Sequence, residues 1–417
     1  MNWSLKIIST VFHCFSLFLL REESPQTQSI KSKMSFGVLL VTFVHLLSAF
    51  WHIVLPVAPT QGYACDKNGS VLSYKLNGAK VLATIIGLFY LTRDYIPLTA
   101  FADNFWSGLM ISNILGLAGT LLLYNRGNSQ PETYLRCSTA DRPVTPKAST
   151  EDIRIHHQRG FLLNLFFGVE FNPRVPVPGG GLLDVKMFCY LAGAVLLLLN
   201  VLSIGAVQYR NDGRVSRAMA TYICQLSWFV VEYMYFEKVH LYTYDLFAEK
   251  TGGKLFWGCF VFYPYFYCIG GWAILESRRG DISIIQSVMC LVLFLVGWIL
   301  TRGSNMQKYY FKTEPSKKYF LFVIEQRTIP NSKILVGGFW AYSRHLNYLG
   351  EIVQALATSV PGFLVSGSWV PFLYPLYYVL LFIPRQIDDE VVCKAKYGKA
   401  WIEYTTKVPY RIVPYLY

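Results

Sequence analysis

Long apolar segments constrain this chain more than any other feature of its sequence. A membrane span needs roughly 20 mainly apolar residues, because hydrocarbon offers backbone amides no hydrogen-bond partner and a helix satisfies them internally. The clear candidates are Phe36–Val57, Trp106–Tyr124, Val185–Val207, Met219–Phe236, Leu255–Leu275 and Ile284–Leu300. Weaker candidates, which either cross or re-enter the membrane, are Lys80–Leu91, Ile352–Val365 and Val370–Pro384. The sequence predicts an all-α polytopic membrane protein with about nine or ten membrane helices.

Composition and charge agree with a membrane location. Hydrophobic residues make up 53% of the 417 residues and charged residues only 15%, which is too apolar for a soluble protein of this length. The net charge of +13 would suggest nucleic acid in a soluble protein, but here the basic residues gather where loops meet the membrane. Because Thr301–Lys333 carries seven Lys or Arg against two Glu, the positive-inside rule places this segment in the cytosol. No nucleic-acid partner is expected.

Two polar interruptions, Asn125–Gly160 and Thr301–Val336, divide the chain and contain prolines, as irregular loops do. They leave one helical membrane domain whose polar clusters gather toward the C-terminal third. The opening run Ile7–Leu20 suits either a signal-peptide core or a short first helix. Because Arg21–Glu23 follows it in place of a small-residue cleavage site, a retained first helix is favoured.

Motifs for metals and for soluble nucleotide-binding domains are missing from the sequence. The nine cysteines form no CxxC pair, and the seven histidines lack HExxH spacing. Neither a GxGxxG segment after a strand nor a Walker loop occurs. Any cofactor is therefore expected to bind in a membrane-embedded site, without a metal.

A first polar cluster, Gly338–Glu351, directly precedes an apolar run. Charged and amide side chains beside a membrane helix are costly unless they serve a ligand. Arg344 and His345 suit phosphate, Asn347 suits a carboxamide, and Trp340 suits a planar ring. The alternative is an interfacial belt of aromatic and basic residues.

A second cluster lies in the last 33 residues. Arg385, Asp389, Cys393, Tyr397 and Trp401 follow one another at intervals of four, so a helix would place them on one face. Such a stripe is unlike aliphatic core packing and indicates a polar site. A solvated amphipathic tail is the alternative interpretation.

A third cluster combines carboxylates with tyrosines between Glu232 and Tyr267, and it includes Asp245 and Glu249. Carboxylates buried among aromatic rings have a raised proton affinity, as a general acid working at neutral pH requires. The alternative is interfacial anchoring by tyrosines beside ordinary loop carboxylates.

At these clusters the sequence resembles the sterol reductase family, which includes delta-14, delta-7 and side-chain delta-24 sterol reductases and the membrane half of the lamin B receptor. The resembling segments follow the family's order along most of the chain: Tyr74–Gly78, Phe167–Arg174, Thr243–Asp245, Tyr263–Pro264, Asn305–Lys312, Ser343–Glu351 and the C-terminal residues. In Phe167–Arg174 the resemblance is to the family's Gly-x-Glu-Leu-Asn-Pro-Arg signature.

The resemblance implies a fold of about ten membrane helices, with residues 1–300 contacting the sterol and residues 301–417 binding NADPH. It assigns cofactor contacts to Lys308, Lys312, Trp340, His345, Asn347, Tyr348, Arg385, Asp389 and Tyr397, with the Trp401–Tyr404 region. The two lysines would contact the cofactor's phosphates. A sterol substrate and membrane lipid are the implied partners, in the endoplasmic reticulum if the source is eukaryotic or the inner membrane if it is bacterial.

Several positions depart from the family's pattern. Lys312 stands for an arginine, Leu346 for a proline, and Cys259 for an aspartate common in members that reduce ring bonds. Ala248-Glu249 replaces His-Asp. These changes leave open which double bond is reduced.

An isolated alkene has no carbonyl to stabilise the carbanion that hydride addition would form, so protonation must come first and hydride second. Asp245 or Glu249 is the hypothesised proton source, acting through Tyr244 or Tyr267. Two other functions compete with this one. An isoprenylcysteine-type methyltransferase carries a similar Arg-His-x-x-Tyr motif, and a receptor related to the lamin B receptor would bind sterol without turnover.

Overall fold

The computed structural model describes residues 28–66, 70–129, 138–139, 160–177, 181–277, 279–315, 319–320, 322–323 and 326–417. The predicted first helix at Ile7–Leu20 lies outside the described residues, as does most of the predicted loop Asn125–Gly160.

The chain divides into two compact units. The first comprises Met1–Asn211 and Phe229–Cys268, and the second comprises Asp212–Trp228 and Ile269–Tyr417. Helix α10 (Arg217–Tyr235) contributes residues to both.

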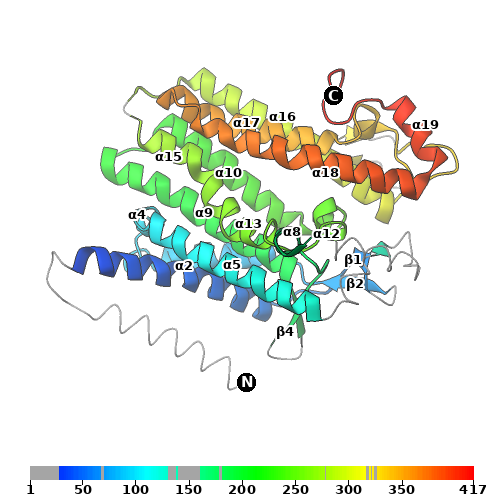
Figure 1. The fold of residues 1–417 in the computed structure, drawn as a ribbon. Helices are drawn as coiled ribbons and strands as arrows, with labels where there is room; N and C mark the ends of the chain where they lie inside the picture. The colour runs from blue at the N-terminus through cyan, green and yellow to red at the C-terminus, as the bar shows by residue number, and fades with distance from the viewer. Residues whose placement is uncertain are drawn as a thin grey trace. The chain divides into compact units, whose positions relative to one another are not determined.

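Helices make up most of the first unit. The longer ones are α2 (Gln28–Val54), α3 (Gly78–Leu91), α5 (Phe105–Ser129), α8 (Gly160–Phe167) and α9 (Val185–Asp212). The short ones are α4 (Ala100–Asp103), α11 (Glu237–His240), α12 (Tyr244–Phe247), α13 (Phe256–Phe260), α14 (Phe262–Tyr265) and the 3-10 helix η1 (Phe266–Cys268). Helix α2 packs against α3 and α5, and Figure 1 shows α2 and α5 side by side.

Short antiparallel strands accompany these helices. Strand β1 (Thr60–Cys65) pairs with both β2 (Val71–Tyr74) and β3 (Ser138–Thr139). Strands β4 (Arg174–Val177) and β5 (Gly181–Asp184) form a second pair, in which Arg174 is opposite Asp184. The second pair delivers the chain directly into α9.

The second unit is built around α16 (Ile284–Thr313), α17 (Leu346–Ser366) and α18 (Leu373–Tyr397), which lie side by side in Figure 1. Its shorter elements are α15 (Ile269–Leu275), α19 (Lys399–Lys407), the 3-10 helices η2 (Gly338–Ala341) and η3 (Val370–Phe372), and the strands β6 (Tyr319–Phe320) and β7 (Phe322–Val323). A Cβ on Gly350 would lie 2.3 Å from Thr301 Oγ1, so glycine lets α17 approach α16 closely.

Six helical segments in the described part of the chain are long and apolar enough to cross a membrane. They are Ser35–Val54, Phe105–Ser129, Val185–Asp212, Phe256–Leu275, Ile284–Thr313 and Leu346–Ser366. The polytopic, mainly helical prediction is therefore confirmed. The predicted span Met219–Phe236 is helical as α10 but is not one of these six.

The predicted end of a helix at Leu300 is wrong, because α16 continues to Thr313. The residues after Leu300 include Met306, Gln307 and Lys308, which favour helix. Gln307 is also buried, and its side chain hydrogen-bonds backbone in the segment around η2. Polarity after Leu300 therefore marks a buried contact surface of the helix and not its end.

The span at 256–275 is broken into α13, α14, η1 and α15, which its uniform hydropathy did not reveal. Pro264 lacks the N–H that an unbroken helix needs. Asn200 Nδ2 donates to Pro264 O at 2.9 Å and satisfies a carbonyl near the break. Broken helices persist in membranes where neighbouring side chains satisfy the backbone in this way.

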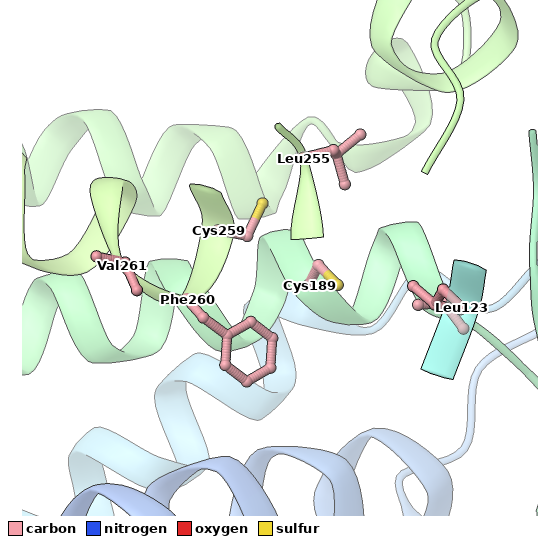
Figure 2. Close-up of a cluster of buried hydrophobic side chains, with 7 residues drawn as sticks. Leu123, Cys189, Leu255, Cys259, Phe260 and Val261 are labelled. Carbon is pink, nitrogen blue, oxygen red and sulfur yellow. The ribbon is translucent and has the colours of Figure 1, made fainter. Parts of the chain in front are cut away.

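A hydrophobic cluster joins α5, α9 and α13 in the first unit. It contains Leu123, Val185, Cys189, Leu255, Cys259, Phe260 and Val261. Figure 2 shows Cys189 on α9 near Cys259 on α13. A Cβ on Gly193 would lie 2.5 Å from Cys259 O, so the two backbones approach closely there. Both cysteines are buried in this cluster as free thiols.

Candidate active site

The last two turns of α16 hold the segment around η2 in the second unit. Gln307 Nε2 donates to Gly337 O at 2.9 Å, and Phe339 N donates to Gln307 Oε1 at 3.0 Å. A Cβ on Gly303 would lie 2.2 Å from the Phe339 ring, so this contact requires glycine or a displaced ring. The amide of Gln307 thus acts as a two-point clamp beside Lys308.

Trp340 lies next to Lys308, and its own position is fixed at two atoms. Its Nε1 donates to Ser304 O at 3.1 Å, and its carbonyl accepts from Tyr404 Oη at 3.4 Å. Lys308 Nζ lies 5.8 Å from the centre of the indole ring. A cation beside an anchored aromatic face suits a ligand that combines phosphate with a planar ring.

His345, Tyr348 and Phe382 form a stack between the start of α17 and the middle of α18. The His345 and Tyr348 ring centroids are 4.9 Å apart, and those of Tyr348 and Phe382 are 4.4 Å apart. Arg385 lies one turn beyond on α18, with its guanidinium carbon 5.8 Å from the Phe382 ring centre. Stacking fixes the orientation of the His345 ring.

His345 and Asp389 face each other, with Nε2 and Oδ2 3.9 Å apart. Burial, reinforced by the positive charges of Lys308 and Arg344, lowers the pKa of His345 to about 3. The imidazole is therefore neutral at pH 7. Burial also raises the pKa of Asp389, against the opposing charge of Lys308. The site therefore holds a neutral His345 ring, the Asp389 carboxyl group and the charge of Lys308 close together. Such a group of side chains can donate and accept hydrogen bonds with a ligand.

Asn347 carries an unused hydrogen-bond acceptor. Its Nδ2 donates to Asn305 Oδ1 at 3.2 Å, and its backbone carbonyl accepts from Thr301 Oγ1 at 3.1 Å. Its side-chain oxygen is buried and has no hydrogen-bond partner within the described part of the chain. A buried acceptor of this kind fits a ligand amide donor, as a nicotinamide carboxamide would provide.

Arg344, which the sequence suggested for phosphate, already has a carboxylate partner. Its Nη2 lies 2.8 Å from Glu390 Oε1, and its backbone N–H donates to Tyr410 O at 3.0 Å. Ser343 Oγ also donates to Ile412 O at 2.8 Å. These contacts attach the C-terminal segment to the start of α17, so Arg344 supports the site's framework.

The two remaining predicted cofactor residues, Lys312 and Tyr397, lie at the C-terminal ends of α16 and α18. Lys312 is in the last turn of α16 and is half-buried. Tyr397 ends α18, and its ring stacks with Trp401 at 6.5 Å across the Gly398 break between α18 and α19. The stripe predicted as one helical face is therefore split after Tyr397, because Gly398 adopts a φ of 55°.

The predicted proton donors belong to the first unit. Asp245 lies on α12, and Glu249 follows this helix with its carboxylate 2.5 Å from Lys254 Nζ. Asp245 and Glu249 both interact electrostatically with Cys259. Tyr267, in η1, packs edge to face with Tyr263 at 5.3 Å. Asp245 and Glu249 thus share one neighbourhood with Cys259.

The signature segment Phe167–Arg174 supports the turn that carries Glu249. Thr251 N donates to Glu170 O, and Lys254 N donates to Phe166 O, both at 2.8 Å. Gly168 has a φ of 87°, and a Cβ there would lie 2.5 Å from Gly252 N. The contact therefore requires glycine at position 168.

The early segment Tyr74–Gly78 is also structural. Asn77 Nδ2 donates to His52 O and Leu55 O, each at 3.0 Å, and so satisfies carbonyls at the end of α2. Gly78 N, at the start of α3, donates to Glu237 Oε2 at 2.8 Å. Sequence analysis did not identify Glu237 as a helix cap, because the two residues are 159 positions apart.

Comparison with known proteins shows which family the chain belongs to. The model of the ergosterol biosynthesis ERG4/ERG24 family matches residues 10–417. The chain belongs to this family. The resemblance drawn from the sequence is thus confirmed over nearly the whole chain.

Several proteins named as sterol reductases align with most of this chain. A delta(14)-sterol reductase of Arabidopsis thaliana is 30% identical over 394 residues, which are 93% of this chain and 97% of the relative. A delta(14)-sterol reductase of Methylotuvimicrobium alcaliphilum is 30% identical over 84% of this chain and 76% of its own length. The 7-dehydrocholesterol reductase of Xenopus laevis is 29% identical over 84% of this chain and 72% of its own length.

Proposed function

We propose that this protein is an NADPH-dependent reductase of a sterol carbon-carbon double bond. The observation that carries the proposal is the family match over residues 10–417, together with the names of its relatives. Two of those relatives are named for the delta-14 bond and one for the reduction of 7-dehydrocholesterol. The delta-14 position is therefore the first to test, followed by delta-7 and the side-chain delta-24 position.

The second unit offers residues suited to hold the cofactor. Lys308 and Lys312 would face phosphate, Trp340 would stack on a ring, and the free acceptor of Asn347 would receive the carboxamide. His345, Tyr348, Arg385, Asp389 and Tyr397 complete the proposed cofactor residues. When bound, a reduced nicotinamide supplies hydride.

Asp245 and Glu249 are the proposed proton sources, and Tyr267 the proposed relay. Protonation of the alkene forms a C–H bond from the π electrons, leaves a tertiary carbocation at the other carbon, and leaves the carboxylate ionised. Hydride then completes the saturated product. Acid and hydride together account for both hydrogens added to the double bond.

We further propose a fold of about ten membrane helices, with sterol contacts in residues 1–300 and the cofactor in residues 301–417. The protein would lie in the endoplasmic reticulum of a eukaryotic cell or the inner membrane of a bacterium. The six candidate spans support an integral membrane location.

The proposal is tested with the full chain purified in detergent. NADPH absorbance is followed with delta-14, delta-7 and delta-24 sterols, and the products are identified by mass spectrometry. Consumption with a product two hydrogens heavier establishes the reaction and the bond together. No turnover of any sterol, combined with methyl transfer from S-adenosylmethionine, overturns the proposal in favour of a methyltransferase.

A further inference from the structure

Lys186, the second residue of α9, is a fully buried lysine at an unfavourable position. Its exposed fraction is 0%, although lysine is among the residues least often buried. The N-terminal end of a helix carries a partial positive charge, which repels an ammonium group. A buried charge at this end requires strong compensation from its neighbours.

Backbone carbonyls of one short segment provide that compensation. Lys186 Nζ donates to Asp245 O at 3.0 Å, to Leu246 O at 3.3 Å and to Glu249 O. An ammonium group has three donors, and these carbonyls use all of them. Two of the three acceptors are the backbone carbonyls of the proposed proton donors, Asp245 and Glu249, so one side chain fixes the backbone of both.

A carboxylate links Lys186 to the family's signature arginine. Asp184 immediately precedes α9, and its Oδ1 accepts from Met187 N at 3.1 Å as a helix cap. Its Oδ2 lies 3.4 Å from Arg174 Nε, and Asp184 also interacts electrostatically with Lys186. Asp184 is thus a nearby acidic partner of both Arg174 and Lys186.

The far end of the segment is held independently. Thr251 N donates to Glu170 O, and Gly252 is in close contact with Gly168. The segment 245–254 is therefore fixed at its first half by Lys186 and at its second half by the signature segment. Removal of Lys186 would release the half that carries Asp245 and Glu249.

We propose that Lys186 is a positioning residue for proton donation: its ammonium group clamps the 245–249 backbone and so sets the places of the Asp245 and Glu249 carboxyl groups. This inference rests on the proposed function, in which those carboxyl groups protonate the sterol. Lys186 itself touches neither substrate nor cofactor in this role.

The test compares Lys186→Met, which keeps the chain length and removes all three donors, with Lys186→Arg, which keeps the charge and several donors. Lys80→Met is the matched control, because Lys80 Nζ also donates to a backbone carbonyl, Pro56 O, but at an exposed site. Hydrogen exchange of the amides in 244–254 is measured together with sterol turnover.

We expect Lys186→Met to speed exchange in 244–254 and to lower kcat about 10- to 100-fold, the size expected from misplacing a reacting group by about 1 Å. The KM for sterol and for NADPH should change less than about twofold, because binding is untouched. The solvent isotope effect on kcat should rise as protonation becomes slower. Lys186→Arg should recover part of kcat, and Lys80→Met should match the wild type.

The outcomes separate this inference from the proposed function. Unchanged exchange in 244–254 for Lys186→Met overturns the clamp, whether or not the protein reduces sterols. Faster exchange with wild-type kcat overturns the role in proton donation while sterol reduction stands. If Lys186→Met does not fold, Lys186→Gln, which keeps two N–H donors but removes the charge, replaces it, and wild-type exchange, kcat and isotope effect in Lys186→Gln would reject the clamp. A wild-type protein inactive on every sterol rejects the proposed function alone, because exchange still reports on the clamp.

Discussion

At the residue scale, the second unit is organised so that side chains fix one another before any ligand arrives. Gln307 and Ser304 hold the segment around Trp340, and Tyr348 holds His345 by stacking. Asn347 differs from them, because its Nδ2 donates to Asn305 whereas its Oδ1 has no partner among the described residues. A buried polar atom without a partner has a cost, which a ligand donor bound at this oxygen would offset.

Replacement of Asn347 by leucine therefore tests the cofactor site at a single atom. Loss of one hydrogen bond of about 1.4 kcal/mol corresponds to a tenfold change in affinity. We expect the Kd for NADPH, measured by titration calorimetry, to rise about tenfold in Asn347→Leu. Asn113→Leu is the control, since Asn113 accepts from Trp257 Nε1 in the first unit. An unchanged Kd in Asn347→Leu would remove the carboxamide assignment.

At the scale of elements, the predicted helices follow from hydropathy, but their ends and breaks do not. The positions of α2, α5, α9 and α17 were visible in the sequence because each has a long apolar stretch. The extension of α16 depends on the distant segment near η2, and the carbonyl of Pro264 at the break is satisfied by the distant Asn200. Local sequence carries no record of such partners.

The contact between Gly168 and Gly252 gives a prediction at this scale. Alanine at 168 meets two penalties, a φ of 87° that suits glycine and a Cβ 2.5 Å from the Gly252 backbone. We expect Gly168→Ala to cost about 1–3 kcal/mol or more and to lower the apparent Tm in a detergent melt.

Gly213→Ala separates the two penalties. Gly213 has a similar φ of 69° but nothing within 4 Å of its Cβ position, so it measures the backbone strain alone. The fall in Tm should be clearly larger for Gly168→Ala. Equal shifts would mean that the close approach of the two loops contributes nothing.

At the scale of the whole molecule, the family could be identified from the sequence, but the residues that hold the candidate segments in place could not. Lys186 at the start of an apolar run resembles an ordinary interfacial anchor, and its burial is visible only in the structure. Glu237 is one of several carboxylates between Glu232 and Tyr267, and its local sequence gives no sign that it caps α3. In both cases the deciding contact spans 59 or more residues of sequence.

Glu237 also makes the stability of the whole protein depend on pH. Burial raises its pKa to about 7, against the opposing hydrogen bond from Gly78 N, whereas a glutamate in the unfolded chain titrates near 4.5. Between these values the folded state binds the extra proton, so the stability contributed by this proton is complete below about pH 4.5 and is lost as the pH rises through about 7. The pH-dependent part of the free energy of unfolding is on the order of 3 kcal/mol.

Glu237→Gln removes this titration and keeps an acceptor for Gly78 N. We expect the wild-type apparent Tm to fall relative to that of Glu237→Gln as the pH rises from 5 to 8, because only the wild type must place a charge in a buried site. The exposed pair of Glu403 with Lys407 supplies the control, since Glu403→Gln should leave the pH dependence unchanged. Parallel Tm curves for the wild type and Glu237→Gln would show that Glu237 keeps one protonation state across this range, and that the α3 cap does not respond to pH.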